Sequence, residues 1–404
     1  MFLEWFATAI SDSIESVLQT VLWWLGPIAL LLALGLSNPA AEVEVAPARG
    51  DLFVGAAGCK SSSCHGGAGE KRSQYLTWSQ KDFHTLSYAI LTNARSARMA
   101  DTLGLTAAQE SSRCTVCHSP FQSVAPARLA PTAHRDEGVS CESCHSAAAS
   151  WLRGHTRKDW TYAMRVTAGM RDLKSFYVRA NTCVACHQNL ESELIKAGHP
   201  ELIFELDRQS VDEPKHWRDN DPQSGLRGWL VGQAVALREM SWALSKNETP
   251  DPTEINRWKG LAWLLARATA QQTGLPPIDQ PVGTTSGPIF TTAQGEADLL
   301  ARRAALFQFS DDFARQLLRA LAATGSEFVV SKETSMDLLF RRAQRLVLAL
   351  DRLSVALSSE PPGAIRNPGL THLFEDIRSR TDFQTQRFSE HLRNFQATIE
   401  RPPR

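Results

Sequence analysis

The sequence predicts a mainly α protein in three parts, and three observations support this prediction. Residues 17–36 are nearly all apolar, residues 51–206 hold all eight cysteines among many Gly, Ser and Pro residues, and residues 207–404 lack cysteine. In this last part apolar residues recur at three- and four-residue intervals, which is typical of amphipathic helices. A chain of 404 residues is long enough for two or three domains. We therefore expect an N-terminal segment over 1–50, a loop-rich domain over 51–206 and an α-helical bundle over 207–404.

The N-terminal segment is predicted to be a hydrophobic membrane helix. The twenty residues 17–36 carry no charge, and about 20 apolar residues suffice to cross a bilayer. A cleaved secretory signal is the alternative, but such signals begin with positive charge, and here no Lys or Arg precedes Arg49. We favour a retained anchor in the cytoplasmic membrane. Either alternative places the remainder outside the cytoplasm, facing the periplasm.

The C-terminal part is predicted to be a bundle of about five helices. Their expected ranges are 226–244, 254–272, 293–323, 332–358 and 370–399. Residues 271–294, rich in Thr, Gly and Pro, are expected to form a long loop. His216, His372 and His391 are isolated in this part, and each is expected to be a surface or capping residue rather than a ligand.

The eight cysteines fall into four Cys-Cys-His motifs. These are Cys59-Lys-Ser-Ser-Ser-Cys64-His65, Cys114-Thr-Val-Cys117-His118, Cys141-Glu-Ser-Cys144-His145 and Cys183-Val-Ala-Cys186-His187. The spacing C-x-x-C-H is that of c-type haem attachment, in which two thiols bond to the porphyrin and the adjacent histidine binds the iron. The first motif has four residues rather than two between its cysteines. We still expect its small serine run to bulge out and let both sulfurs reach one porphyrin.

A zinc ribbon and a disulfide framework are the alternative interpretations of these cysteines. Neither needs a histidine directly after the second cysteine of each pair, whereas haem attachment does. We therefore expect four covalently attached haem c groups, each named below by its motif histidine. The fold class is then a loop-rich multihaem cytochrome c domain followed by an α-helical bundle, with an N-terminal hydrophobic helix.

Further histidines could bind the irons from the opposite side. Residues 51–206 contain four histidines outside the motifs: His84, His134, His155 and His199. Four irons and four spare histidines would give bis-histidine coordination throughout. The alternative for each is an ordinary hydrogen-bonded or solvated histidine. Met99, Met164 and Met170 could also bind iron, although methionines at helical spacing more often belong to a core.

The order and spacing of these motifs resemble the tetrahaem cytochrome family of nitrifying bacteria, the cytochrome c-554-like multihaem cytochromes. Three further features carry the resemblance: Trp78-Ser followed by four residues and His84, Gly138-Val139-Ser140 running into the third motif, and His155 shortly after it. The resemblance covers residues 51–206. It implies haems stacked in close pairs, along which electrons hop.

The resemblance also implies an assignment of the distal histidines. His155 would bind the haem of His65, His84 the haem of His187, and His199 the haem of His145. The haem of His118 would correspond to one that lacks a distal ligand in the family, unless His134 fills that position.

These patterns predict a periplasm-facing electron carrier that relays electrons between redox partner proteins. The alternative is an enzyme that reduces or oxidises a small nitrogen or sulfur species at an open haem. The bundle could dock the cytochrome onto a membrane respiratory complex. The formal net charge is zero, so charge does not indicate nucleic acid as a partner.

Overall fold

The computed structural model describes most of the chain beyond the N-terminal segment. The described residues are 52–217, 221, 223–270, 274–280, 286–331, 334–357 and 368–400. The hydrophobic helix predicted over 17–36 therefore lies outside the described residues. No helix within the described ranges is both long enough and apolar enough to cross a membrane.

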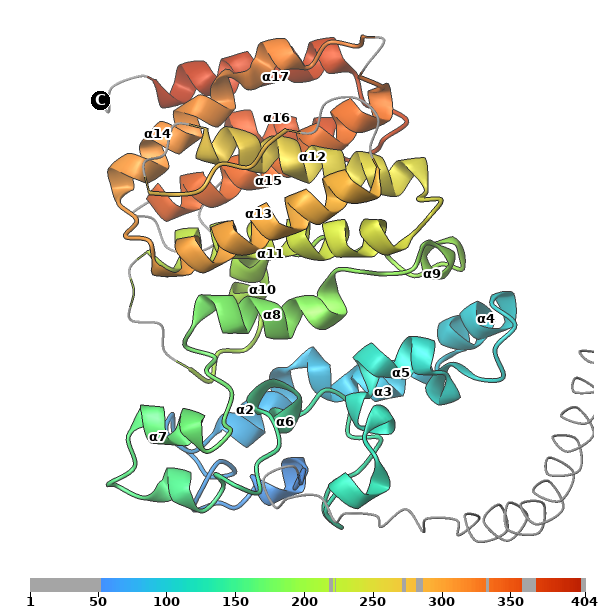
Figure 1. The fold of residues 1–404 in the computed structure, drawn as a ribbon, viewed down its shortest axis with the longest axis vertical. Coiled ribbons are helices and arrows are strands. Elements are labelled where there is room, and N and C mark those ends of the chain that lie inside the picture. Colours follow the sequence, from blue (N-terminus) through green and yellow to red (C-terminus); the bar gives the residue numbers. More distant parts are fainter. Residues whose placement is uncertain are drawn as a thin grey trace, which may run out of the picture. The chain divides into compact units, whose positions relative to one another are not determined.

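The mainly α prediction is confirmed for the described residues. They contain no strand beyond one isolated bridge between Phe53 and Leu129. Seven helices form the C-terminal bundle (Figure 1). They are α11 (Ser224–Lys246), α12 (Pro252–Thr269), α13 (Gly287–Leu306), α14 (Asp311–Ala322), α15 (Met336–Leu357), α16 (Pro368–Asp376) and α17 (Thr385–Ile399).

The helix predicted over 293–323 is divided into α13 and α14. The N–H of Phe313 donates to the Ser310 side chain, which caps the start of α14. The Phe307 ring turns back onto Phe313, with ring centroids 5.6 Å apart. The apolar period continues through the break because the aromatic residues of the connection are themselves packed in the core. Periodicity alone therefore missed a helix end that a serine cap signals.

Two other boundaries differ from the predicted ones. The helix predicted over 370–399 is divided into α16 and α17, which contact each other. The loop predicted over 271–294 is shorter at its C-terminal end, because α13 begins at Gly287. Pro288 occupies the first turn of α13, where its missing N–H leaves no hydrogen bond unmade.

The bundle has one continuous apolar core. Its largest fully buried side chains include Trp229, Trp258 and Trp263, and α11 packs against both α12 and α13. The same core reaches Ala180 and Val184 of α8 (Phe176–His187). The core thus includes residues on both sides of the boundary predicted at 206, and the helix of the fourth motif is part of it.

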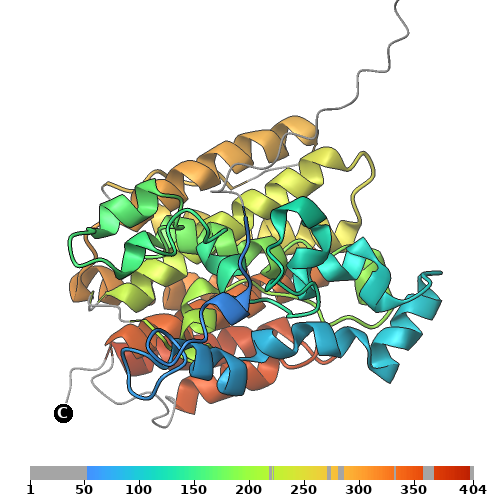
Figure 2. The same ribbon diagram turned by 90° about the horizontal axis from the view of Figure 1, so that it is seen from below.

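The preceding region consists of short helices joined by irregular segments (Figure 2). Its α-helices are α2 (Gln74–Lys81), α3 (Ser87–Leu91), α4 (Ala94–Thr102), α5 (Ser112–His118), α6 (Cys141–His145), α7 (Tyr162–Thr167), α8, α9 (Ser192–Lys196) and α10 (Leu206–Asp212), and its short 3-10 turns include η2 (Ala56–Gly58), η3 (Phe83–Leu86) and η7 (Gly154–Thr156). A small apolar cluster of Leu91, Ala100 and Ala108 is separate from the bundle core. Loops and brief helices are the structure expected of a chain that wraps several macrocycles.

Candidate haem centres

Three of the four motifs are the last turn of a helix. Helices α5, α6 and α8 each end at the motif histidine: His118, His145 and His187. In a helix the residues i, i+3 and i+4 lie on one face, so both sulfurs and the imidazole of such a motif point the same way. The first motif instead lies in a series of turns after η2, consistent with its longer spacing.

The motif histidines each face a second histidine across a gap of nearly constant width. The ring centroids are 6.1 Å apart for His65 and His155, 6.1 Å for His84 and His187, 6.3 Å for His118 and His199, and 6.5 Å for His145 and His216. Every pair contains one motif histidine, although the four partners come from four different segments of the chain.

This width fits one metal ion held between two imidazoles. A metal–nitrogen bond is about 2.0 Å, and the ring centre lies about 1.1 Å beyond the nitrogen, so two rings on one iron have centres roughly 6.2 Å apart. Histidines that merely packed against each other would stack closer, as His372 and His391 do at 5.1 Å. The donor set therefore fits the haem iron that the motifs imply.

His155 faces His65 from a rigid turn. Its ring lies edge-on to Trp151, with centroids 5.4 Å apart, and its Nδ1 is hydrogen bonded to the carbonyl of Leu152. Gly154 lets the Trp160 ring pack against this turn, because a Cβ at position 154 would lie 2.1 Å from that ring. With Nδ1 engaged, Nε2 is the nitrogen free to meet an iron.

His84 is held by the residues that carry the family resemblance. The Trp78 indole donates to the Val139 carbonyl at 3.0 Å, and the Val139 N–H donates to the His84 carbonyl at 3.2 Å. Gly138 has φ of 72°, and a Cβ there would lie 2.8 Å from the same His84 carbonyl oxygen. The two sequence features are therefore one structural unit, which fixes the backbone of His84 opposite His187.

Ser87 joins this unit to the second motif. Its hydroxyl is 2.7 Å from the His84 carbonyl and 2.8 Å from the His118 carbonyl, while the His118 Nδ1 lies 3.2 Å from the Ser87 carbonyl. The Ser87 hydroxyl can donate to only one carbonyl at a time. This buried serine thereby links the backbone of His84, whose ring faces His187, to the backbone of His118.

The ring pairing differs from the implied assignment at His199. His199 faces His118 rather than His145. The reason lies in α9, whose N-terminal residues are joined to the second motif: Arg113, directly before Cys114, forms ion pairs with Glu191 and Glu193. These contacts carry the segment that ends at His199 toward α5.

His216, expected to be a surface or capping residue, is the one that faces His145. It follows α10, which packs closely on α11 because a Cβ at Gly232 would lie 2.9 Å from Leu206. His134, proposed as the partner of His118, is exposed and is not one of the paired rings. Four spare histidines inside 51–206 matched four irons in number, and this match hid the fifth candidate. Which of these histidines bind iron stays a prediction.

The motifs lie next to one another in two pairs. The thiols of Cys59 and Cys141 lie close enough for Cys141 to lower the pKa of Cys59, and Cys186 lowers the pKa of Cys117 in the same way. The buried Glu142 carboxylate joins the first pair, because it accepts the N–H groups of Val54 and Gly55 at 3.0 and 2.6 Å. None of the eight cysteines is in a disulfide.

A guanidinium links the third and fourth motifs. Arg171 donates to the Ser143 carbonyl of α6 at 3.0 Å and to the Thr182 hydroxyl of α8 at 3.5 Å. The thiols of Cys144 and Cys183 are also close enough for their charges to interact. The two motif pairs are thereby joined through the third and fourth motifs.

Burial keeps most of the paired imidazoles in the neutral form that binds metals. It lowers the pKa of His145 and of His187 to about 4. Burial likewise lowers the pKa of His118, His155 and His216. His84 is the exception, because its hydrogen bond to Asp82 raises its pKa.

Apolar side chains are exposed beside these gaps. Phe83, adjacent to His84, is 82% exposed, and Val116, between the cysteines of the second motif, is 53% exposed. Leu86 and Ile90 follow Phe83 at helical spacing and are also exposed. A porphyrin is the kind of surface that covers such residues, so their position fits a haem-binding site.

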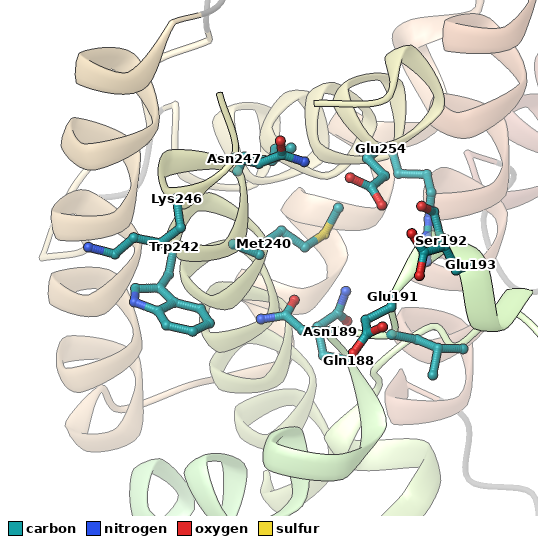
Figure 3. Close-up of a pocket in the computed structure, with 14 residues that line it drawn as sticks. Gln188, Asn189, Glu191, Ser192, Glu193, Met240, Trp242, Lys246, Asn247 and Glu254 are labelled. Carbon is teal, nitrogen blue, oxygen red and sulfur yellow. The ribbon is translucent and has the colours of Figure 1, made fainter. Parts of the chain in front are cut away.

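A separate pocket lies between the cytochrome region and the bundle (Figure 3). It has a volume of about 420 Å³, and its walls come from the segment after His187 and from the ends of α11 and α12. Trp242 and Lys246 lie on one side, and Ser192 and Glu193 on the other (Figure 3). None of the eight paired histidines lines this pocket, so it is not one of the iron sites.

A mainly helical fold with four Cys-Cys-His motifs, each histidine facing another, defines a multihaem c-type cytochrome, a class that carries electrons. Residues 59–146 match the family described as cytochrome c554 and c-prime, which confirms the resemblance over that segment. The family implies covalently bound haem c and a location outside the cytoplasm. No curated protein and no solved structure matches the chain significantly.

Proposed function

We propose that this protein is a periplasm-facing tetrahaem cytochrome that relays electrons between redox partner proteins through closely spaced, bis-histidine haems. The observation that carries the proposal is the set of four histidine pairs at 6.1 to 6.5 Å, each with one motif histidine. Haem c supplies one-electron redox chemistry when bound. The chain attaches the haems, ligates both faces of each iron and holds the motifs near one another.

The proposed order of the haems follows the neighbouring motifs: His65, His145, His187 and His118. The proximity of the Cys59 thiol to that of Cys141, and of the Cys117 thiol to that of Cys186, supports the first and last steps of this order. The Arg171 link between α6 and α8 supports the middle step. Such an order would give electrons an entry at one end and an exit at the other.

A closed carrier is favoured over an enzyme at the haem of His118. An enzyme of small nitrogen or sulfur species needs an iron with one free position, and His199 faces His118 at 6.3 Å. We further propose that the N-terminal apolar segment anchors the protein in the cytoplasmic membrane. The bundle would then dock the cytochrome onto a membrane respiratory complex.

The test uses two histidine variants of the mature protein. Denaturing mass spectrometry should first find four covalent haems, because four motifs use all eight cysteines. Low-temperature electron paramagnetic resonance of the oxidised protein should then show only low-spin iron. His216→Ala should convert one haem to high spin, because His216 faces His145. His134→Ala is the matched control and should change nothing.

A high-spin haem in the unaltered protein would contradict the closed carrier. If His134→Ala also added a high-spin haem, His134 rather than a paired ring would be a ligand. Carbon monoxide should bind the reduced unaltered protein at far below one equivalent per haem. It should bind the reduced His216→Ala protein at one equivalent per protein molecule.

A further inference from the structure

One of the paired histidines differs from the others in what its second ring nitrogen contacts. The Nδ1 atom of His84 lies 3.0 Å from Oδ1 of Asp82. The corresponding atoms of five other paired histidines contact neutral oxygens. His65 contacts the Gln74 amide at 2.9 Å, and His118, His155, His199 and His216 contact the backbone carbonyls of Ser87, Leu152, Pro200 and Pro214. Among these six contacts, only that of His84 is to a carboxylate.

The Asp82 carboxylate is built into the fold rather than placed on the surface. Its side chain is 7% exposed, and it begins the 3-10 turn η3. The same Oδ1 accepts the backbone N–H of His84 at 2.9 Å. The backbone contact holds the carboxylate next to His84, so rotation of the imidazole ring would break its contact with Oδ1.

We propose that Asp82 is a positioning residue that lowers the reduction potential of the haem of His187 below those of the other three haems. This inference rests on the proposed function, in which His84 and His187 bind one iron. A carboxylate that accepts the Nδ1–H draws the proton away from the ring and makes Nε2 a stronger electron donor. A stronger donor, together with a nearby negative charge, favours the ferric state and lowers the potential.

A second carboxylate, that of Glu213, adds to the negative electrostatic potential at His84. Ligand atoms of Asp82, His84 and Glu213 all lie within 4.8 Å of one another. Glu213 follows α10 and precedes His216, the histidine that faces His145. The two acidic residues therefore lie between the third and fourth motifs, at the centre of the proposed haem order. The haem of His187 is then the last of the four to be reduced.

The experiment measures the four potentials in the full holoprotein. Spectroelectrochemical titration is fitted to four one-electron components, and each variant is compared with the unaltered protein. Asp82→Asn keeps the size of the side chain and removes its charge. It should raise the lowest potential by at least a tenfold change in the ferric–ferrous equilibrium, which is 59 mV for one electron. The low-spin resonance of one haem should shift at the same time.

Two further variants separate the effect of a carboxylate in contact with Nδ1 from the effect of a negative charge that is merely nearby. Glu213→Gln removes a neighbouring charge and leaves the Nδ1 contact intact, so it should move the same component by less than Asp82→Asn does. Gln74→Glu supplies a carboxylate to His65, whose Nδ1 lies 2.9 Å from the Gln74 amide oxygen. It should lower a different component, and it tests the principle at a site where the native fold is not disturbed by losing Asp82.

The possible outcomes distinguish this inference from the proposed function. Four low-spin haems with unchanged potentials in Asp82→Asn would overturn the role of Asp82. Equal shifts in Asp82→Asn and Glu213→Gln would also overturn it, because charge alone would then account for the effect. Missing or high-spin haems in the unaltered protein would instead overturn the proposed function.

Discussion

The bundle and the cytochrome region are both helical, yet they are stabilised by different interactions. In the bundle, helices such as α11 and α15 bury continuous rows of apolar side chains, among them Leu339, Leu346 and Leu350 at 0% exposure. In the described part of the cytochrome region, the separate apolar cluster has three buried members, Leu91, Ala100 and Ala108, while Phe83 is 82% exposed. The bundle therefore carries its own core, whereas the cytochrome region needs the covalent cofactor to complete its packing.

Helix α8 belongs to both regions and couples them. Ala180 and Val184 on this helix lie in the bundle core, whereas Cys183, Cys186 and His187 form the fourth motif. The Tyr177 hydroxyl donates to Asp298 of α13 at 2.6 Å. The fourth motif is therefore anchored by the bundle core, whereas the other three motifs contribute no residue to that core.

The largest expected effect comes from withholding haem. In protein produced without haem attachment, amide hydrogens of α5 and α6 should exchange fully within seconds, while those of α11 and α15 stay protected. The reason is that the former helices have few buried apolar contacts of their own. Hydrogen exchange with mass spectrometry measures this, and α8 should show intermediate protection. Equal protection in the two regions would mean that the cytochrome region is held together without haem.

Truncating a core leucine should affect only the bundle's own stability. Leu350→Ala removes a side chain at 0% exposure, and we expect a loss of about 2–5 kcal/mol in the free energy of unfolding. The control is Leu306→Ala, where the side chain is 80% exposed and the change should be within about 0.5 kcal/mol. Denaturant unfolding followed by helical circular dichroism gives both values. A native haem spectrum altered by Leu350→Ala would show that the coupling through α8 transmits a change in the bundle core to the haem sites.

Changing Gly138 should affect only the cytochrome region. Gly138→Ala places a Cβ 2.8 Å from the His84 carbonyl oxygen at a φ of 72°, and we expect a cost of about 1–3 kcal/mol. Gly69→Ala is the matched control, since φ is 90° there but nothing lies within 4 Å of the added atom. Only the first variant should shift the low-spin resonance of one haem. Equal effects of the two variants would mean that positive φ, not the contact with His84, is what matters.

The smallest effect concerns the polar link between α8 and α13. Burial alone would raise the pKa of Asp298, but hydrogen bonds from Tyr177, Arg302 and Arg238 outweigh it and lower the pKa to about 2. Because the folded pKa lies below the usual 3.8, this carboxylate stabilises the fold above about pH 4 and loses that contribution as the pH falls toward 2. The site is partly exposed, so solvent screening keeps the effect small.

Asp298→Asn should therefore lower thermal stability slightly at pH 7 and have a smaller effect near pH 2, where the carboxylate is partly protonated. Asp312→Asn, with a side chain 87% exposed, is the control and should match the unaltered protein at both values. Calorimetry at a series of pH values measures the difference between variants. A difference that grows as the pH falls would contradict the assigned sign.

Features that depend on neighbouring residues in the chain could be predicted from the sequence alone. Haem attachment needs two cysteines and a histidine within a few residues, so the motifs could be recognised without a structure. Amphipathic periods likewise located the bundle helices, because each helix carries its own apolar face. The ends of those helices were less certain: the break at Ser310 depends on aromatic side chains that keep the apolar period while the backbone turns.

Which histidine faces which motif could not be predicted from the sequence and follows from the tertiary packing. Nothing local marks His216 rather than His134 as a ligand, since both lie next to a basic residue and neither has a motif around it. What places His216 opposite His145 is the packing of α10 on α11, which a glycine at position 232 permits. A distal ligand is contributed across space, and its identity depends on the path of the chain between contacts far apart in sequence. That path is set by packing, which a one-dimensional pattern does not contain.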